Sequence, residues 1–306
     1  MTRLSDWLPS SRFIDLRPIV TIGICARNAD EILPTAIESV VKQNFPHELM
    51  EIIFVDDGSE DDTLKVIREY ASSIDITSRI FSIKWSGLGK ARNIVIENAR
   101  GEYVTWLDSD EILENDFLRK QFEFIEHHPA AGVVTAKLGI PSEHNPVLVL
   151  ELIPMAVEYS RQNWANPSKM PGTGGTTYSV RAAHQTGGFD ENMARGGEDV
   201  DMAGRIGKAG WQILKGNAVF YENHGGLSTW KGLWQRYLVQ GKYCRRLHSK
   251  TNRFISLYRM NPVASFVAGV SYTVIGYRTT RLKIAFLLPF HFVFKMTAWF
   301  YGFSKE

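Results

Sequence analysis

The stretch Thr105–Leu113, TWLDSDEIL, places Asp108 and Asp110 one residue apart, directly after a run of apolar and β-branched residues. Alternate side chains of an extended chain point to the same side, so both carboxylates can face one point. A divalent cation would relieve their repulsion, and Mg²⁺ or Mn²⁺ prefers oxygen ligands and often keeps diphosphate oxygens in its shell. The pair predicts a metal–diphosphate site; the alternative is a turn in which Asp caps a helix over residues 111–118.

Two further motifs could bind a nucleotide. Asp56 and Asp57 end another predicted strand, where a carboxylate can accept hydrogen bonds from a base or ribose, or can cap the next helix. In GLGKARN, residues 87–93, glycines bring the backbone close to a ligand, and Lys90 and Arg92 can meet phosphate charge at a helix start. This motif is not a P-loop, so it does not support an ATP-type phosphate site, and a plain turn is its alternative.

A third acidic motif, GGEDVD at residues 196–201, suits general-base chemistry. Its glycines predict a mobile loop that presents Glu198 and Asp199 at a helix N-terminus. A carboxylate there can take a proton from a hydroxyl, or can simply stabilise the helix dipole. His224 ends a late predicted strand, where it is either a structural residue or a nitrogen ligand to the metal.

The elements that must position these residues alternate between strand and helix. Continuous apolar runs predict buried strands, and apolar residues at helical spacing predict helices between them. We predict strands at 18–28, 50–59, 79–85 and 101–108 and helices at 30–43, 60–72 and 87–100, followed by strands at 130–140 and 212–224 and a helix from about Glu198. Alternation at these lengths predicts an α/β fold with a parallel sheet, whose ligands gather at the carboxyl ends of the strands.

Charge is distributed unevenly along the 306 residues. Residues 1–222 carry an excess of acidic side chains, whereas residues 223–305 contain 13 Lys or Arg and no acidic residue. A long basic stretch rich in Trp, Tyr and Phe predicts a surface that meets anions, either nucleic acid or lipid headgroups. The two cysteines, Cys25 and Cys244, favour a reducing compartment over a disulfide framework, and the N-terminus is too polar for a signal peptide.

The last third of the chain has the composition of a membrane-associated segment. Residues 228–260 contain a basic amphipathic helix with an apolar stripe, a type that lies in a membrane interface or binds a partner. Apolar runs follow at 262–277, which is short for a membrane span, and at 284–303, which Pro289, His291 and Lys295 interrupt. We expect interfacial helices plus one or two short or re-entrant segments; packing as ordinary core or as an oligomer interface is the alternative.

The order of these motifs resembles the inverting nucleotide-sugar glycosyltransferases of family two. The resemblance runs from about Ile19 to Tyr243 and rests on TIGICARN, IIFVDDGSEDD, GKARN, GEYVTWLDSDE, GGFDE, GGEDVDMAGRIGKAGW and the dipeptide Asn223-His224. Enzymes similar to dolichyl-phosphate-mannose synthase and to cellulose synthase belong to this family. The resemblance implies the GT-A fold, a Rossmann-like and mostly parallel sheet flanked by helices. We therefore expect a catalytic domain at 1–227, interfacial helices at 228–260 and membrane segments at 261–306.

The resemblance also implies roles for particular residues. Asp199 matches the catalytic base, and Asp57 matches the residue that holds the nucleotide base. The Tyr-Asn-Glu usual near the first strand reads Arg27-Asn28-Ala29 here, which puts the donor base in doubt. The implied donor site comprises Ala26, Asn28, Asp57, Lys90, Arg92 and Asp108; the metal site comprises Asp108, Asp110 and His224; the acceptor side comprises Gly174, Gly175, Glu198 and Trp230.

The implied function is metal-dependent, inverting transfer of a hexose. The donor would be GDP-mannose or a UDP-hexose, with mannose favoured, and Mn²⁺ or Mg²⁺ would be the cofactor. The acceptor would be a polyprenyl- or dolichyl-linked lipid at a membrane, with the catalytic domain on the cytoplasmic side and no nucleic acid as partner. The alternatives are a UDP-sugar-dependent transferase with a soluble or polysaccharide acceptor, a non-catalytic protein that binds sugar nucleotides or nucleic acid, and a nucleotidyltransferase.

Overall fold

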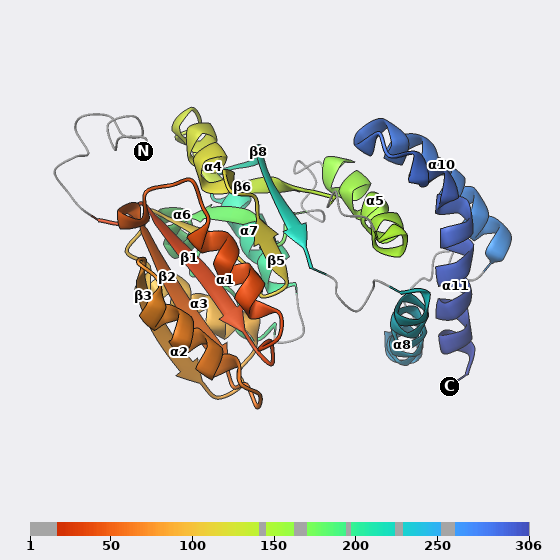
Figure 1. Cartoon of the computed structure of the whole chain (residues 1–306), viewed down its shortest axis with the longest axis horizontal. Coiled ribbons are helices and arrows are strands. Elements are labelled where there is room, and N and C mark those ends of the chain that lie inside the picture. Colours follow the sequence, from red (N-terminus) through yellow and green to blue (C-terminus); the bar gives the residue numbers. More distant parts are fainter. Residues whose placement is uncertain are drawn as a thin grey trace. The chain divides into compact units, whose positions relative to one another are not determined.

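The computed structural model describes residues 17–140, 145–161, 170–193, 197–223, 229–251 and 261–305. The chain divides into two compact units. The sheet unit comprises residues 1–137 and 162–223, and the helical unit comprises residues 138–161 and 224–306. Figure 1 shows both along the chain.

A single eight-stranded sheet, in the order β3-β2-β1-β4-β7-β6-β8-β5, forms the first unit. Strands β3, β2, β1 and β4 are parallel, whereas β7 pairs antiparallel with both β4 and β6 and β5 pairs antiparallel with β8. The sheet is thus mixed rather than mostly parallel. The strands are β1 Val20–Ala26, β2 Met50–Asp57, β3 Thr77–Ile83, β4 Tyr103–Trp106, β5 Glu111–Leu113, β6 Ala131–Leu138, β7 Thr176–Ser179 and β8 Gln212–Glu222.

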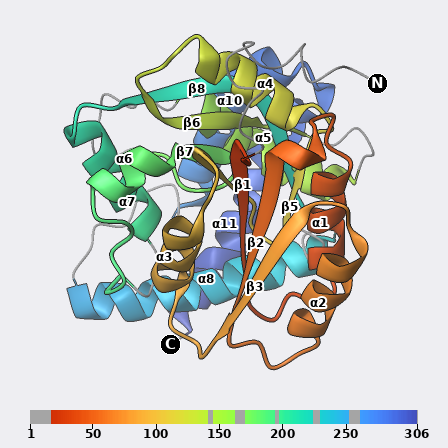
Figure 2. The ribbon, with the colours of Figure 1, turned by 90° about the vertical axis from the view of Figure 1, so that its left-hand side faces the viewer.

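Helices cover both faces of the parallel half of the sheet (Figure 2). Apolar side chains of α3 pack with β1, β2 and β4 in a cluster that also includes residues of α6 and α7. On the other side, α1 follows β1 and α2 follows β2, and α4 packs on β8. The helices of this unit are α1 Leu33–Val41, η2 His47–Leu49, α2 Thr63–Ser73, α3 Leu88–Asn98, α4 Phe117–Glu126, α6 Val180–Gln185 and α7 Glu198–Lys208.

The register aligns the carboxyl ends of the strands that carry the acidic motifs. Ala26, the last residue of β1, pairs with Asp56 in β2, and Gly23 of β1 pairs with Trp106 of β4. All eight residues of β2 are buried, as expected for a parallel strand covered on both faces. The motifs that follow β1, β2 and β4 therefore emerge at one edge of the sheet.

The second unit is helical. It contains α5 Pro146–Arg161, α8 Trp230–Thr251, α10 Pro262–Thr280, the short η5 Lys283–Leu287 and α11 Leu288–Ser304. Helix α11 packs against α8 and α10, and α10 also packs against α5. Within the described residues, Lys283–Ser304 is the one helical segment whose length and composition would suit a membrane crossing, and half of its most apolar window is buried inside the protein.

Several sequence expectations differ from this architecture. Strands β5 and β7 were not predicted, and the 111–118 segment begins with β5 instead of a helix. Helix α5 groups with the C-terminal helices, although the sequence places it inside the 1–227 domain. In α8, Leu233 and Tyr237 of the predicted interfacial stripe are buried in a cluster with Met296 and Trp299 of α11, so these apolar groups already have a protein partner.

Candidate active site

Two acidic motifs come together at the carboxyl edge of the sheet. Asp57 is the last residue of β2, and Asp108 follows β4. Between them, β1 carries the buried thiol of Cys25. Burial raises the pKa of this thiol to about 12; Arg92 lowers it, while Asp108 and Asp57 raise it further. The charges of Asp57, Asp108 and Arg92 therefore all act on one buried atom.

Asp57 also organises the loop between β3 and α3. Its Oδ1 accepts a hydrogen bond from the Ser86 amide at 2.7 Å, and its Oδ2 accepts one from the Gly87 amide at 2.9 Å. Gly58, with φ of +71°, passes so close to this loop that a Cβ would lie 2.5 Å from the Trp85 nitrogen. The carboxylate predicted to hold the nucleotide base is therefore buried and fixed by two backbone donors, and each oxygen keeps a second lone pair.

Arg92 is the central cation of the site. It lies on α3 and is buried, and its guanidinium contacts Glu198 at 2.5 Å and Asp108 at 3.3 Å. The Cζ atom of this guanidinium lies 5.9 Å from the centre of the Trp106 ring and 5.8 Å from the centre of the Phe189 ring. The phosphate contact predicted for Arg92 stays a prediction, because the structure shows a guanidinium already engaged on both sides.

Glu198 and Asp199 begin α7 and face the same arginine. Burial alone would lower the pKa of Arg92, but Asp108, Glu198 and Asp199 outweigh it and raise that pKa. The Asp199 Oδ1 accepts from the Val200 amide at 2.7 Å, and a Cβ on Gly172 would lie 2.8 Å from its Oδ2. Asp199 is half-buried, whereas Glu198 is buried and ion-paired with Arg92. The predicted position of Glu198 on the acceptor side stays a prediction.

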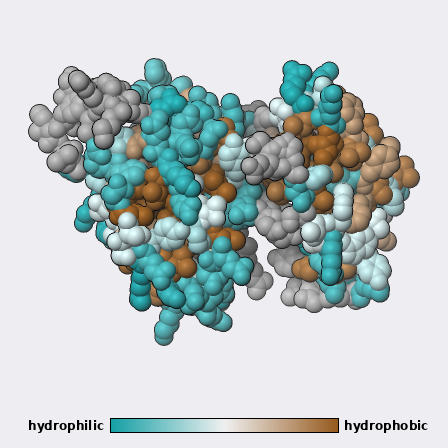
Figure 3. Space-filling model, viewed as in Figure 1, coloured by the Kyte–Doolittle hydropathy of each residue, from teal (hydrophilic) through white to brown (hydrophobic). Residues whose placement is uncertain are grey.

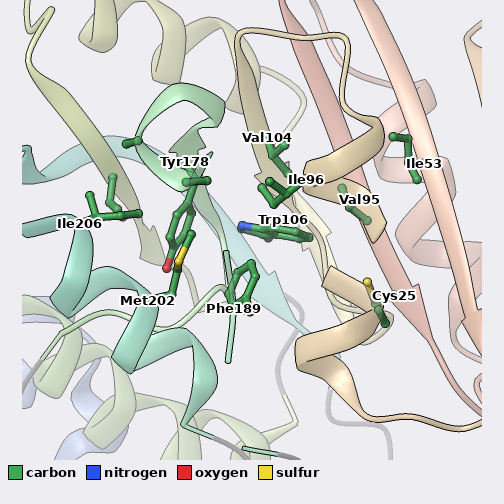
Figure 4. Packing of buried hydrophobic residues seen from close by; sticks show 14 of the residues in the cluster. Cys25, Ile53, Val95, Ile96, Val104, Trp106, Tyr178, Phe189, Met202 and Ile206 are labelled. Carbon is green, nitrogen blue, oxygen red and sulfur yellow. The ribbon is translucent and has the colours of Figure 1, made fainter. Parts of the chain in front are cut away.

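Two aromatic residues that were not predicted, Trp106 of β4 and Phe189, lie beside the Arg92 guanidinium. Figure 4 shows both of them with Tyr178 of β7. Trp106 contacts Tyr178 edge to face at 6.4 Å and Phe189 at 5.5 Å between ring centres. Burial raises the pKa of the Tyr178 hydroxyl, and Asp199 raises it further. Trp106 Nε1, Tyr178 OH and Glu198 Oε2 are buried atoms for which the described residues provide no hydrogen-bond partner. Trp106 and Phe189 each had a signal in the sequence, since they belong to the motifs WLDSD and GGFDE; Tyr178 belongs to neither.

Glu111 supports the loop that carries the acidic pair and was also missed. Its Oε2 accepts hydrogen bonds from the Asp108 amide at 3.1 Å and the Gly175 amide at 3.4 Å. Burial raises the pKa of Glu111, and Asp108 and Asp110 raise it further. The signal in the sequence was its position: Glu111 is an acidic residue that directly follows D-x-D. In the structure it begins strand β5 and is buried.

The predicted metal ligands are carboxylates on one short loop. The side chain of Asp108 is 39% exposed, and the backbone carbonyl of Asp110 accepts from the Asn223 amide at 2.6 Å. His224 lies outside the described residues, among which no cluster of three or more His, Cys, Asp or Glu is arranged to hold a metal. Two carboxylates suit a hard cation that keeps the remainder of its shell for phosphate oxygens and water.

The remaining predicted residues lie in several environments. Asn28, with φ of +50°, accepts from the Glu60 amide at 2.8 Å through its side chain, and Lys90 is exposed in the first turn of α3. Ala26 is buried at the end of β1. Gly174 accepts at its carbonyl from Thr176 Oγ1 at 3.0 Å, and Gly175, with φ of +54°, lies against the Phe220 ring. Trp230 belongs to the helical unit, where its ring contacts those of His291 and Phe294.

Comparison with known proteins agrees with this geometry. Chondroitin synthase of Escherichia coli is 32% identical over 195 residues, which are 63% of this chain and 27% of that protein. The poly(ribitol-phosphate) beta-N-acetylglucosaminyltransferase TarS of Staphylococcus aureus is 31% identical over 113 residues, or 37% of this chain and 20% of that protein. The chain thus matches only a minor part of the length of these two relatives.

Solved structures share the fold over almost the whole chain. The mannosyltransferase PcManGT of Pyrobaculum calidifontis, solved with GDP-Man and Mn²⁺, aligns with a TM-score of 0.58 at 18% identity, over 98% of this chain and 91% of that chain. TarS residues 1–349 with UDP-GlcNAc align with a TM-score of 0.51 at 17% identity, over 93% and 90%. These neighbours confirm the predicted GT-A fold.

The family profile described as glycosyl transferase family 2 matches residues 21–185, a span that runs from β1 through the Asp57, Arg92 and Asp108 motifs to the end of α6. That span is more than half of the chain. The protein belongs to glycosyl transferase family 2.

Proposed function

We propose that this protein is an inverting glycosyltransferase that moves a hexose from a nucleotide sugar to a lipid-linked acceptor at a membrane. GDP-mannose is the favoured donor and a UDP-hexose the alternative, and the acceptor is a polyprenyl- or dolichyl-linked molecule. The sheet unit lies on the cytoplasmic side. The proposal rests on two things: the membership of this chain in glycosyl transferase family 2 and the geometry of its candidate site.

The single observation that carries the proposal is the convergence of three distant acidic motifs on two residues. Arg92 forms ion pairs with Asp108 and with Glu198, the neighbour of Asp199. Cys25 lies on β1, between β2, which ends at Asp57, and β4, which precedes Asp108, and both aspartates raise its pKa. A nucleotide sugar needs a group for its base, charge at its diphosphate and a base for the incoming hydroxyl. Asp57, the 108–110 pair and Asp199 provide these in that order.

Asp199 acts as the general base in this mechanism. It takes the proton from an acceptor hydroxyl, whose oxygen attacks the anomeric carbon opposite the leaving nucleoside diphosphate and inverts the configuration. Arg92 binds both Glu198, the neighbour of Asp199, and Asp108. It therefore fixes the start of α7 against the loop that carries Asp108. An acceptor phosphate would arrive already ionised and would need Asp199 less.

Asp108 and Asp110, with His224 as a further candidate, would hold Mg²⁺ or Mn²⁺. A bound divalent cation would stabilise the charge that develops on the departing diphosphate. The Glu111 carboxylate, which accepts hydrogen bonds from the Asp108 and Gly175 amides, keeps the loop of these ligands in place. The Mn²⁺ in the PcManGT structure supports the choice of metal.

The variant Asp199→Asn tests the proposal. We expect it to abolish sugar transfer from GDP-mannose or UDP-hexoses while nucleotide binding, measured by thermal shift with and without Mn²⁺, persists. Release of nucleoside diphosphate is the expected product. Undiminished transfer by the variant would refute the role of Asp199. Release of inorganic diphosphate would instead indicate a nucleotidyltransferase, and salt-sensitive nucleic-acid binding without transfer would indicate a binding protein.

A polymer acceptor is the second candidate. The names of two relatives, chondroitin synthase and the poly(ribitol-phosphate) transferase TarS, specify polymers, which favours a polysaccharide or polyol-phosphate acceptor for this chain as well. Offering the enzyme a polyprenyl phosphate and a soluble glycan chain side by side, with the same donor, separates the two candidates.

A further inference from the structure

The surface of the helical unit carries exposed apolar residues, and brown atoms gather on this unit in Figure 3. On α10, large apolar side chains recur at helical spacing on one side and are 39–72% exposed: Val263, Phe266, Val267, Val270 and Val274. Phe286, Leu287 and Phe290 in η5 and α11 are 51–66% exposed. Ring contacts from Phe266 to Phe290, at 5.8 Å, and from Tyr277 to Phe286, at 5.4 Å, join the two segments. We call these eight apolar residues the α10 face.

The inner side of α10 is built from small residues. Ser265, Gly269, Thr273 and Gly276 are buried. A Cβ on Gly269 would lie 2.4 Å from the Pro289 Cα, and one on Gly276 would lie 2.6 Å from the Ile153 side chain. A helix in water buries its large apolar side chains, whereas helices in lipid pack through small residues and turn large ones outward. Helix α10 therefore has the arrangement of a helix that meets lipid.

Helix α11 buries His291 and Lys295 together with the apolar side chains Phe292, Met296 and Trp299, whereas Phe290, Phe300 and Tyr301 are exposed. Glu151 of α5 accepts from His291 Nε2 at 2.9 Å and from Lys295 Nζ at 3.0 Å. Tyr237 of α8 donates to the same carboxylate. Glu151 thus binds both polar residues that interrupt the apolar run inside the unit, although the buried His291 Nδ1 has no hydrogen-bond partner among the described residues.

Basic residues border the apolar face at one end. Arg278 and Arg281 follow the stripe at the end of α10, and Lys283 begins η5; all three are exposed, and no ion pair is recorded for them in the described parts of the chain. No acidic residue occurs from 223 to 305. The two carboxylates that α5 adds, Glu151 and Glu158, each accept a tyrosine hydroxyl. The face and its border thus match an acyl layer beneath anionic headgroups.

We propose that the α10 face inserts into the acyl region of an anionic bilayer, with Arg278, Arg281 and Lys283 at the headgroups. This inference rests on the membrane association in the proposed function, but not on sugar transfer. The membrane contact is the α10 face. The apolar stripe of α8 is not the contact, because it packs on α11. A second copy of this chain is the other occupant that the test must distinguish from a bilayer.

The test uses flotation of the full chain with vesicles of phosphatidylcholine alone or of phosphatidylcholine mixed with phosphatidylglycerol, whose anionic headgroups attract basic residues. We expect binding to the anionic vesicles that weakens in high salt. The variant V267Q/V270Q/V274Q should lose about tenfold or more of its partitioning. The variant R278Q/K283Q should lose the preference for anionic vesicles. Val239→Gln, an exposed apolar position of α8 away from the face, is the matched control and should bind as the unmodified chain does.

Two outcomes with the substituted chain would overturn the proposal. One is equal vesicle binding by the unmodified chain and V267Q/V270Q/V274Q. The other is a change in that variant from dimer to monomer in solution, with no vesicle binding by either form, which would assign the face to a second copy. Asp199→Asn keeps its vesicle binding if docking is independent of catalysis. If the unmodified chain transfers sugar to a soluble acceptor but binds no vesicles, the proposed docking surface is wrong and the proposed transfer reaction still stands.

Discussion

Arg92 is a cation shared by two acidic motifs. Its partners Asp108 and Glu198 lie 16 and 106 positions away in the sequence, and Trp106 and Phe189 enclose the guanidinium. The motif GKARN predicted a basic residue near the site, but no pattern in a single sequence pairs it with Glu198. The sequence thus named Arg92, Asp108 and Glu198 as separate candidates, and the tertiary fold brings the three into contact.

Replacement of Arg92 by lysine should separate positioning from phosphate binding. Lysine keeps the charge but cannot form the fork that reaches Glu198 and Asp108 together. We expect a loss of about 1–3 kcal/mol in unfolding free energy, because a buried carboxylate oxygen loses its hydrogen bond, and a fall in kcat of about 100-fold with little change in nucleotide affinity. Urea unfolding and steady-state kinetics measure both.

The exposed Lys90 provides the control for stability, because Lys90→Met should leave the unfolding free energy within about 0.5 kcal/mol. If Arg92→Lys instead weakens nucleotide binding and keeps kcat, the guanidinium contacts phosphate, and the positioning role is wrong.

Gly175 is a position that only glycine can occupy. It has φ of +54°, and a Cβ would lie 2.2 Å from the Phe220 ring. Gly187, with φ of +81°, has nothing within 4 Å of its Cβ position and serves as the matched control. We expect Gly187→Ala to cost about 1 kcal/mol, from the left-handed backbone alone, and Gly175→Ala to cost about 1–3 kcal/mol more from overlap with the ring. Thermal unfolding of both variants checks this; equal losses would mean that Phe220 moves freely out of the way.

At the scale of elements, the sequence predicted the regular half of the sheet unit. Strands β1, β2, β3 and β4 and the helices between them follow from apolar runs and helical spacing, because each is covered by its own neighbours in the chain. Strand β7, the sequence TTYS among glycines, has no alternating pattern, since all four residues are buried. Helix α5 is apolar on several sides and contains Pro154, so its periodicity is weak.

The network around Glu151 ties three helices together. Burial alone would raise the pKa of Glu151, but hydrogen bonds from His291 and Tyr237 and the charge of Lys295 lower it below its ordinary value. Glu151→Gln would leave the buried ammonium of Lys295 without its counter-ion. We expect this change to cost about 3–5 kcal/mol of unfolding free energy.

Glu158 lies on the same helix and gives the comparison for this prediction. It is exposed and accepts a hydrogen bond from the Tyr272 hydroxyl, so Glu158→Gln should change stability by about 0.5 kcal/mol or less. Chemical unfolding of the full chain, followed by tryptophan fluorescence, measures both variants. Similar small effects for the two glutamates would mean that water, not Glu151, stabilises Lys295.

For the molecule as a whole, the two units interleave in the sequence. Residues 138–161 lie between two halves of the sheet unit but belong with the C-terminal helices. The buried side chains Leu150, Ile153 and Val157 of α5 pack with Ala285, Leu288 and Phe292. The sequence could not reveal this arrangement, because residues 162–223, which fold into the other unit, lie between the partner segments in the chain.

This connectivity predicts the behaviour of a chain that ends at Asn223. Every strand of the sheet would be present, but α5 would lose the partners of Leu150, Ile153 and Val157, and each exposed side chain costs about 1.5–3 kcal/mol relative to burial. We expect the truncated chain to aggregate, and the same chain with Leu150→Gln, Ile153→Gln and Val157→Gln to remain a monomer in light scattering. Far-ultraviolet circular dichroism would verify that the sheet unit of the substituted chain is folded. A truncated chain that stays monomeric without these substitutions would show that α5 finds its cover within the sheet unit, and the division of the chain into two units would then have to place α5 with the sheet.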